Sequence, residues 1–167
     1  MQEVSRTRQI AETGLLAAFI AVTGAVKLPG LFPGTEFQLS APLAVAICAV
    51  FGFTQYIVAG MIASLIGLIL GTQNLLNVAI AMVFRLTVGG LLSTLGTSWP
   101  VVAMAGPIGS AVARLSLSAF IGKAALPLLL AALPGMVYTA LAAWPLTVLL
   151  RRVRAQAGKV VRYAVQR

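Results

Sequence analysis

The sequence predicts an all-α integral membrane protein, a bundle of about six transmembrane helices with both termini in the cytoplasm. Of its 167 residues, 60% are hydrophobic and 9% are charged, whereas soluble domains are about 45–50% apolar and about 25% charged. The basic residues gather outside the apolar runs, at Arg6 and Arg8 before the first run and from Arg151 to Arg167 after the last. The positive-inside rule places such ends in the cytoplasm, which requires an even number of spans.

The apolar runs divide into six expected spans within one membrane domain that covers residues 1–167. A span needs about 20 residues to cross a hydrocarbon core of about 30 Å, and glycine, proline and polar clusters mark the breaks between spans. The expected spans are 10–26, 37–53, 56–71, 78–95, 101–121 and 124–150, followed by a basic cytoplasmic tail at 151–167.

The first three spans are separated by two breaks of different kinds. Lys27, Pro29 and Gly30 end the first span and begin a loop of helix-breaking residues. The apolar stretch 37–71 is too long for one crossing and is interrupted at 52–55, Gly-Phe-Thr-Gln. A helical hairpin is therefore expected there.

The last three spans follow polar or proline-containing segments. A polar turn from Gln73 to Asn77 precedes the fourth span, and Gly-Thr-Ser-Trp-Pro at 96–100 ends it. The fifth span is expected to kink at Pro107, and Lys123 marks the next turn. The sixth span is expected to be long and bent, because it contains Pro127, Pro134 and Pro145.

The residues that most enzymes need are missing from this chain. It has no histidine and no aspartate, and its acidic residues are Glu3, Glu12 and Glu36. A Ser-His-Asp triad, a carboxylate pair and a His/Cys metal site are thereby excluded, and there is no P-loop for ATP. We expect no enzyme, metal or cofactor. The net charge of +9 lies mainly at the chain ends, which favours contact with anionic lipid over nucleic acid.

Two arginines inside expected spans are the strongest candidates for binding. Arg85 lies about eight residues from the outer end of the fourth span and Arg114 about eight from that of the fifth, which places both about 12 Å below the outer surface. A charge at that depth is costly and faces a partner or a watery cavity. Two guanidiniums at one depth suggest a pocket for a carboxylate or phosphate. The alternative for each is snorkelling, or bonding to backbone carbonyls near Gly89 or Gly106.

Polar residues in two outer loops are weaker candidates. Glu36 and Gln38 could bind a solute or cap the second span, where a carboxylate suits the helix dipole. Gln73, Asn74 and Asn77 could contact a solute or serve as turn and cap residues.

Small residues at helical spacing mark the first span. Gly14, Ala17, Ala18, Ala21 and Ala25 recur at three- and four-residue intervals, a pattern that lets helices approach closely. Such a stripe could pack within the chain or against another subunit.

Short motifs over the whole length resemble the substrate-binding S components of energy-coupling factor (ECF) importers. Ala17-x-x-x-Ala21 resembles the family's docking motif, the segment 84–92 (Phe-Arg-Leu-Thr-Val-Gly-Gly-Leu-Leu) is similar to its fourth span, and 134–152, with Tyr138, is similar to its last helix. The resemblance implies capture of a solute at the outer face of a prokaryotic plasma membrane, under a first loop that acts as a lid. It also implies docking to a transmembrane coupling subunit and two cytoplasmic ATPases.

The expected solute is small and anionic. The two arginines favour a carboxylate-bearing vitamin or precursor, such as pantothenate, nicotinate, lipoate or an amino acid. Tyr138 on the last helix is a further candidate for contact, and Ala25 extends the docking stripe. The alternative function is a structural or assembly protein of the cell envelope that binds no solute.

Overall fold

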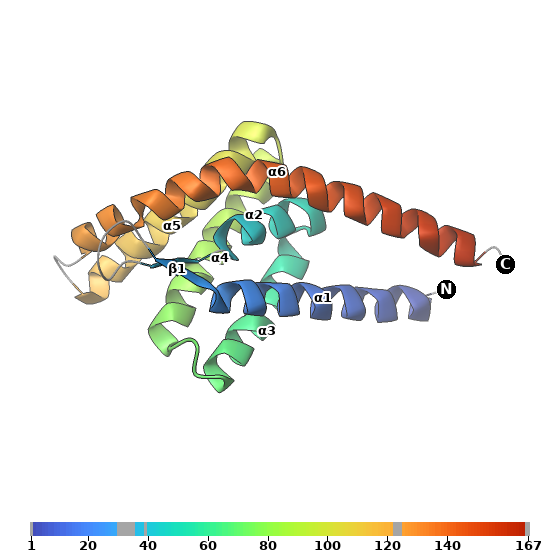
Figure 1. Cartoon of the computed structure of the whole chain (residues 1–167), viewed down its shortest axis with the longest axis horizontal. Coiled ribbons are helices and arrows are strands. Elements are labelled where there is room, and N and C mark those ends of the chain that lie inside the picture. Colours follow the sequence, from blue (N-terminus) through green and yellow to red (C-terminus); the bar gives the residue numbers. More distant parts are fainter. Residues whose placement is uncertain (1, 30–35, 39, 122–124, 166–167) are drawn as a thin grey trace.

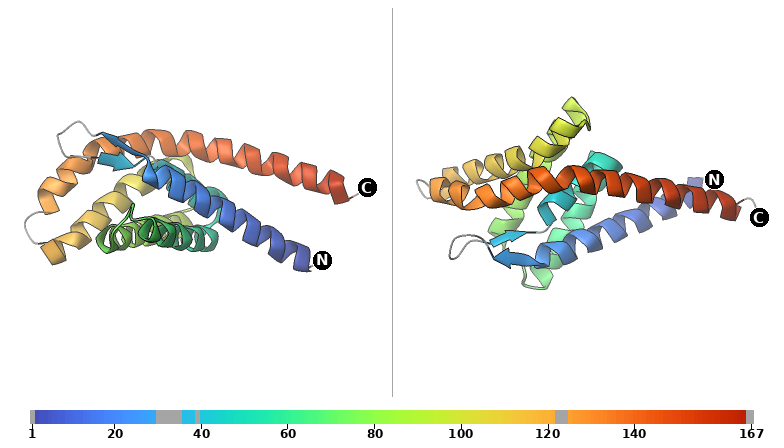
Figure 2. Two further views of the ribbon diagram at one scale, coloured as in Figure 1. Left: turned by 60° about the horizontal axis from the view of Figure 1, so that its bottom comes forward. Right: turned by 45° about the horizontal axis from the view of Figure 1, so that its top comes forward.

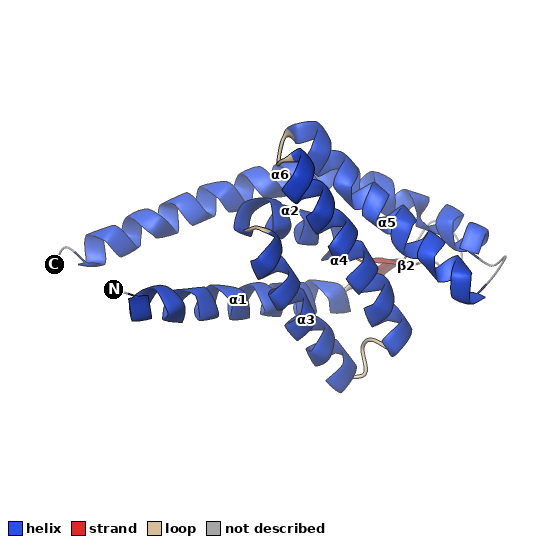
Figure 3. Ribbon diagram, turned by 180° about the vertical axis from the view of Figure 1, so that it is seen from behind, coloured by secondary structure: helices blue, strands red, loops and turns tan. Residues whose placement is uncertain are grey.

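The computed structural model describes residues 2–29, 36–38, 40–121 and 125–165, and this part of the chain is almost wholly helical (Figures 1 and 3). The expected all-helical architecture with six helices is confirmed. In chain order the elements are α1 Gln2–Ala25, β1 Lys27–Pro29, β2 Glu36–Gln38, α2 Ser40–Phe51, α3 Phe53–Ile69, α4 Leu75–Leu95, α5 Trp99–Ile121 and α6 Ala125–Val165.

Two helices of the described chain are long and apolar enough to cross a membrane. They are α4, Leu75–Leu95, and the part of α6 from Leu129 to Gly158. The apolar helices α2 and α3 have 12 and 17 residues, fewer than the about 20 that a perpendicular crossing needs.

A short β-hairpin replaces part of the loop expected after the first span. β1 and β2 pair antiparallel with Leu28 opposite Phe37 and Pro29 opposite Glu36. The sequence prediction of helix from residue 37 was wrong here, because α2 begins only at Ser40. A strand of three residues is too short to show the alternation that identifies strands in a sequence.

Two of the expected helix breaks have clear local causes. Gly52 separates α2 from α3 with a φ of 90°, in the left-handed region that favours glycine. Asn74 caps the start of α4, where its side-chain oxygen accepts a 2.8 Å hydrogen bond from the backbone N–H of Asn77, as expected of an N-cap.

α6 continues past the expected end of the last span and reaches Val165. Its 41 residues correspond to a length of about 60 Å. Figures 1 and 2 show it as one long arched helix that ends on the same side of the molecule as the N-terminus of α1. Pro134 and Pro145 both lie inside it.

The short helix α2 lies at the centre of the bundle. Val45, Ala46 and Ile47 are buried in succession, so α2 is covered by protein around its circumference. The neighbouring helices α5 and α6 approach closely where Gly106 faces the side chain of Thr139. Small residues at such crossings allow the tight packing that holds helices together in an apolar solvent.

Candidate functional site

A cavity of about 380 Å³ lies between the six helices, with walls that are mostly small or apolar. Each helix contributes to its lining, and Gln73 contributes from the turn between α3 and α4. The polar residues of the lining are Ser40, Tyr56, Gln73, Asn77, Arg85, Ser110, Arg114 and Thr139.

Arg85 projects from α4 toward the inward face of α3 and is only 5% exposed. Its Nη1 donates a 2.8 Å hydrogen bond to the hydroxyl of Ser64 and a 3.4 Å bond to the sulfur of Met82. The guanidinium lies over Gly60, where a Cβ would collide with it. Since a guanidinium has five N–H donors, Arg85 keeps donors for another group in the cavity.

Arg114 is half-buried on α5 and lines the same cavity. Its Nη1 donates a 3.3 Å hydrogen bond to the backbone carbonyl of Ser110, one turn earlier. This bond is of the kind that the alternative interpretation of the arginines required, but it occupies one of five donors. Arg114 therefore has donors available for a solute as well.

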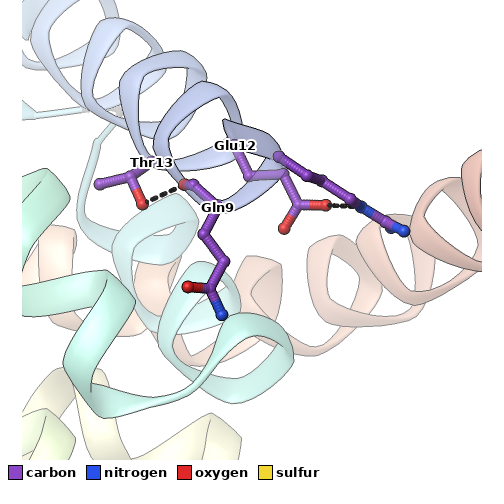
Figure 4. A network of polar contacts seen from close by, with 4 residues as sticks. Gln9, Glu12 and Thr13 are labelled. Carbon is purple, nitrogen blue, oxygen red and sulfur yellow. Dashed lines mark hydrogen bonds and ion pairs between the residues drawn. The ribbon is translucent and has the colours of Figure 1, made fainter. Parts of the chain in front are cut away.

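Neither cavity arginine has a carboxylate partner within the described chain. The ion pair found there joins Arg8 to Glu12 at 2.8 Å on α1. Figure 4 shows Glu12 in that pair, beside the hydrogen bond from the Thr13 hydroxyl to the Gln9 carbonyl. The positive charge of the cavity is thus not neutralised by the side chains described around it.

Tyr56 and Gln73 also line the cavity; Gln73 is one of the turn residues that the sequence offers as weaker candidates, whereas Tyr56 is not among the predicted binding residues. Tyr56 is fully buried. Among the described residues, its hydroxyl and Oε1 of Gln73 are buried polar atoms without a hydrogen-bond partner. The sequence does contain a signal for the inward position of Tyr56. This residue lies four residues before Gly60 and eight before Ser64, on the small-residue face of α3.

The other predicted binding residues are spread more widely. Asn77 lines the cavity, whereas Asn74 acts as the N-cap of α4 and Tyr138 is half-buried on α6 outside the lining. Glu36 and Gln38 lie in β2, and their side chains, like the whole of residue 123, fall outside the part that the structure describes.

The predicted docking residues on α1 do not share one exposed face. Ala17 is 1% exposed and belongs to the core, and Ala21 is half-buried against that core. Ala25 is exposed, as are Gly14 and Ala18. Ala17 therefore cannot present its methyl group to another subunit in this conformation, because it packs inside its own bundle.

The arrangement suits the binding of a small anion. Planar guanidiniums match carboxylates with paired, charge-assisted hydrogen bonds, and the apolar walls around them strengthen electrostatic attraction. No cluster of His, Cys, Asp and Glu that could hold a metal ion is present among the described residues.

Comparison with known proteins finds a clear relative. The chain is 55% identical over 144 residues, 86% of its own length and 87% of the relative's, to Protein BioX from Lysinibacillus sphaericus. No protein-family model and no solved structure matches the chain.

Proposed function

The chain belongs to the family of Protein BioX, and we propose that this member is the substrate-binding subunit of an ECF-type importer that captures a small carboxylate-bearing solute. The observation that carries the proposal is the shared cavity of Arg85 and Arg114, two guanidiniums without a carboxylate partner in the described chain. A solute carboxylate would supply the missing negative charge. The size of the cavity, about 380 Å³, lies within the range of small-molecule sites.

The outer faces of the helices support placement of the whole bundle in a membrane. Large apolar side chains are exposed on helices throughout the bundle, as in Leu15, Ile69, Leu86, Met104 and Leu141. In water such a surface would drive association, whereas lipid is a favourable environment for it. The shortness of α2 fits this placement, because a helix surrounded by protein need not match the bilayer thickness.

The position of the termini supports the proposed topology. Both chain ends lie on one side of the molecule (Figures 1 and 2), which agrees with an even number of crossings and with basic ends in the cytoplasm. Gln73, in the turn before α4, and Asn77, in the first turn of α4, both line the cavity. In this topology that turn faces outward, so a solute would enter from the outer side.

The energy for uptake would come from partner subunits that dock to this chain. The chain has no ATP-binding motif, so uptake against a gradient would require ATPase subunits and a transmembrane coupling subunit. The exposed stripe of Gly14, Ala18 and Ala25 on α1 is the docking surface that we propose in place of Ala17, because small residues let a partner helix approach closely.

Native mass spectrometry of the protein extracted in mild detergent from its own cells tests this function. We expect a stoichiometric small carboxylate, together with co-purifying coupling and ATPase subunits. A protein that carries no solute and only other envelope proteins would contradict the importer and favour the assembly role.

A further inference from the structure

The cavity contains charged and uncharged polar groups, and a bound anion would pair only with the charged ones. Arg85 and Arg114 supply charge, whereas Tyr56 and Gln73 supply uncharged polar atoms that have no partner among the described residues. A buried polar atom that loses its water without gaining a new bond costs about 1–3 kcal/mol. A solute that fills the cavity must therefore offer a hydrogen bond to these atoms or bind weakly.

The positions of these groups indicate an elongated set of contacts along α3. Tyr56, Gly60, Ser64 and Gly67 are all buried and lie on one face of this helix. The Arg85 guanidinium lies over Gly60, and the Gln73 side chain lies over Gly67, with its Oε1 3.3 Å from where a Cβ would stand. Since the rise per residue is about 1.5 Å, Tyr56 and Gly67 are about 16 Å apart along the helix.

We propose that the solute carries, in addition to its carboxylate, an uncharged group with an N–H or O–H donor that bonds to Gln73 Oε1. This inference rests on the proposed function and narrows its substrate class. The Gln73 oxygen accepts hydrogen bonds and cannot donate, so a second carboxylate at that point would find no partner in it. An amide, a ureido group or a hydroxyl satisfies it. A fatty acid or a simple dicarboxylate does not.

The molecule that co-purifies with the protein gives the first test. Its mass gain in heavy water counts its N–H and O–H hydrogens, and methylation counts its carboxyl groups. We expect more exchangeable hydrogens than carboxyl groups. Equal numbers would overturn this inference and leave carboxylate capture intact, whereas the absence of any carboxyl group, or of any bound molecule, would overturn the proposed function and this inference with it.

Matched pairs of added compounds separate the two contributions. Biotin and lipoate share a carboxylate arm, but only biotin has N–H donors on its ring. Pantothenate and panthenol differ at one end, where pantothenate has a carboxylate and panthenol has an alcohol. With equal concentrations in native mass spectrometry, we expect biotin retained over lipoate and pantothenate over panthenol. Equal retention of biotin and lipoate would contradict the requirement for an N–H or O–H donor. Equal retention of pantothenate and panthenol would contradict the carboxylate site, and retention of none of the four compounds would contradict both.

Two variants test the atoms themselves. Tyr56→Phe and Gln73→Leu each remove a polar group with little change in volume. We expect Gln73→Leu to weaken retention of the donor-bearing compound about tenfold without affecting lipoate, and Tyr56→Phe reports whether the second unpartnered group contacts the same compound. Gln55→Leu is the matched control, because Gln55 precedes Tyr56 but does not line the cavity. Equal retention by the wild type and both variants, with thermal unfolding unchanged, would remove these residues from solute contact.

Discussion

Arg85 of α4 and Ser64 of α3 are joined by a 2.8 Å hydrogen bond from the guanidinium Nη1 to the serine hydroxyl, in the buried interior of the bundle. The bond fixes the direction of the arginine side chain at its charged end. Because long flexible side chains lose entropy when they bind a ligand, an arginine held in advance binds an anion at a smaller cost.

Gly60→Ala should weaken anion binding by displacing Arg85. A Cβ at Gly60 would enter the space of the arginine Nε, Cδ and Cζ, so the guanidinium must leave its position beside Ser64. We expect the affinity for the co-purifying solute to fall about tenfold, by loss of roughly one charge-assisted hydrogen bond. Native mass spectrometry with added solute measures the change. Gly90→Ala is the control, since a Cβ there meets no atom within 4 Å; equal affinities of the two variants would contradict the packing of Arg85 on Gly60.

Arg114→Ala should lower the affinity for a carboxylate by at least about 30-fold, because truncation of one partner in a buried charge pair costs about 2–5 kcal/mol. Arg114→Lys should give an intermediate affinity, since an ammonium keeps the charge but lacks the planar fork. Titration of the purified protein with the identified solute measures both. Arg152→Ala, which removes an exposed arginine of α6, should bind as the wild type does. An unchanged affinity in Arg114→Ala would exclude this arginine from the site.

Phenylalanine substitutions at neighbouring positions of α1 should separate docking from folding. Ala18 is exposed and Ala17 is buried. We expect Ala18→Phe to abolish uptake by cells while solute binding and thermal unfolding stay normal. Ala17→Phe should instead destabilise the protein by about 1–3 kcal/mol or more through overpacking. Uptake assays, combined with thermal unfolding in detergent, provide the readout; normal uptake with Ala18→Phe would argue against the proposed docking surface.

Arg154→Ala should reduce stability where α6 packs against the end of α2. Arg154 of α6 donates to the backbone carbonyl of Val50 near the end of α2, and its guanidinium lies 4.9 Å from the ring centroid of Phe51. Loss of both interactions should cost about 1 kcal/mol, seen as a lower midpoint of thermal unfolding. Arg152→Ala serves again as the control; if the two variants unfold alike, the contacts of Arg154 contribute no measurable stability.

Local helix-breaking and capping residues predict much of the helical order. The glycine at position 52 and the asparagine at position 74 indicate two of the breaks from the sequence alone, because each has a specific backbone role. The hairpin at Leu28 and Phe37 was not predictable, since its strands are held by pairing across the loop and not by a local pattern. The continuation of α6 to Val165 was not predicted either, because a basic segment ends an apolar span without ending the helix.

The charged groups of the candidate site were predictable, whereas its neutral groups were predictable only in the turn and first residues of α4, where Asn77 lines the cavity. Arg85 and Arg114 stand out because a charge inside an apolar run is costly and needs a reason. Tyr56 gives only the weaker signal of its small-residue helix face, since a tyrosine near a helix end is also common at a membrane interface. The burial of Ala17 was not predictable, because spacing identifies a small-residue stripe, while only tertiary packing decides which of two adjacent small residues faces inward.

The unneutralised arginines of the cavity also bear on how the protein matures in the cell. Two like charges held in a largely apolar enclosure disfavour the folded state, and a bound anion relieves that penalty. A ligand at about 100 times its dissociation constant adds about 2.7 kcal/mol to folding stability. Under the proposed function, the solute would then stabilise the protein that binds it, and the folded fraction of newly inserted chains would rise with the solute concentration.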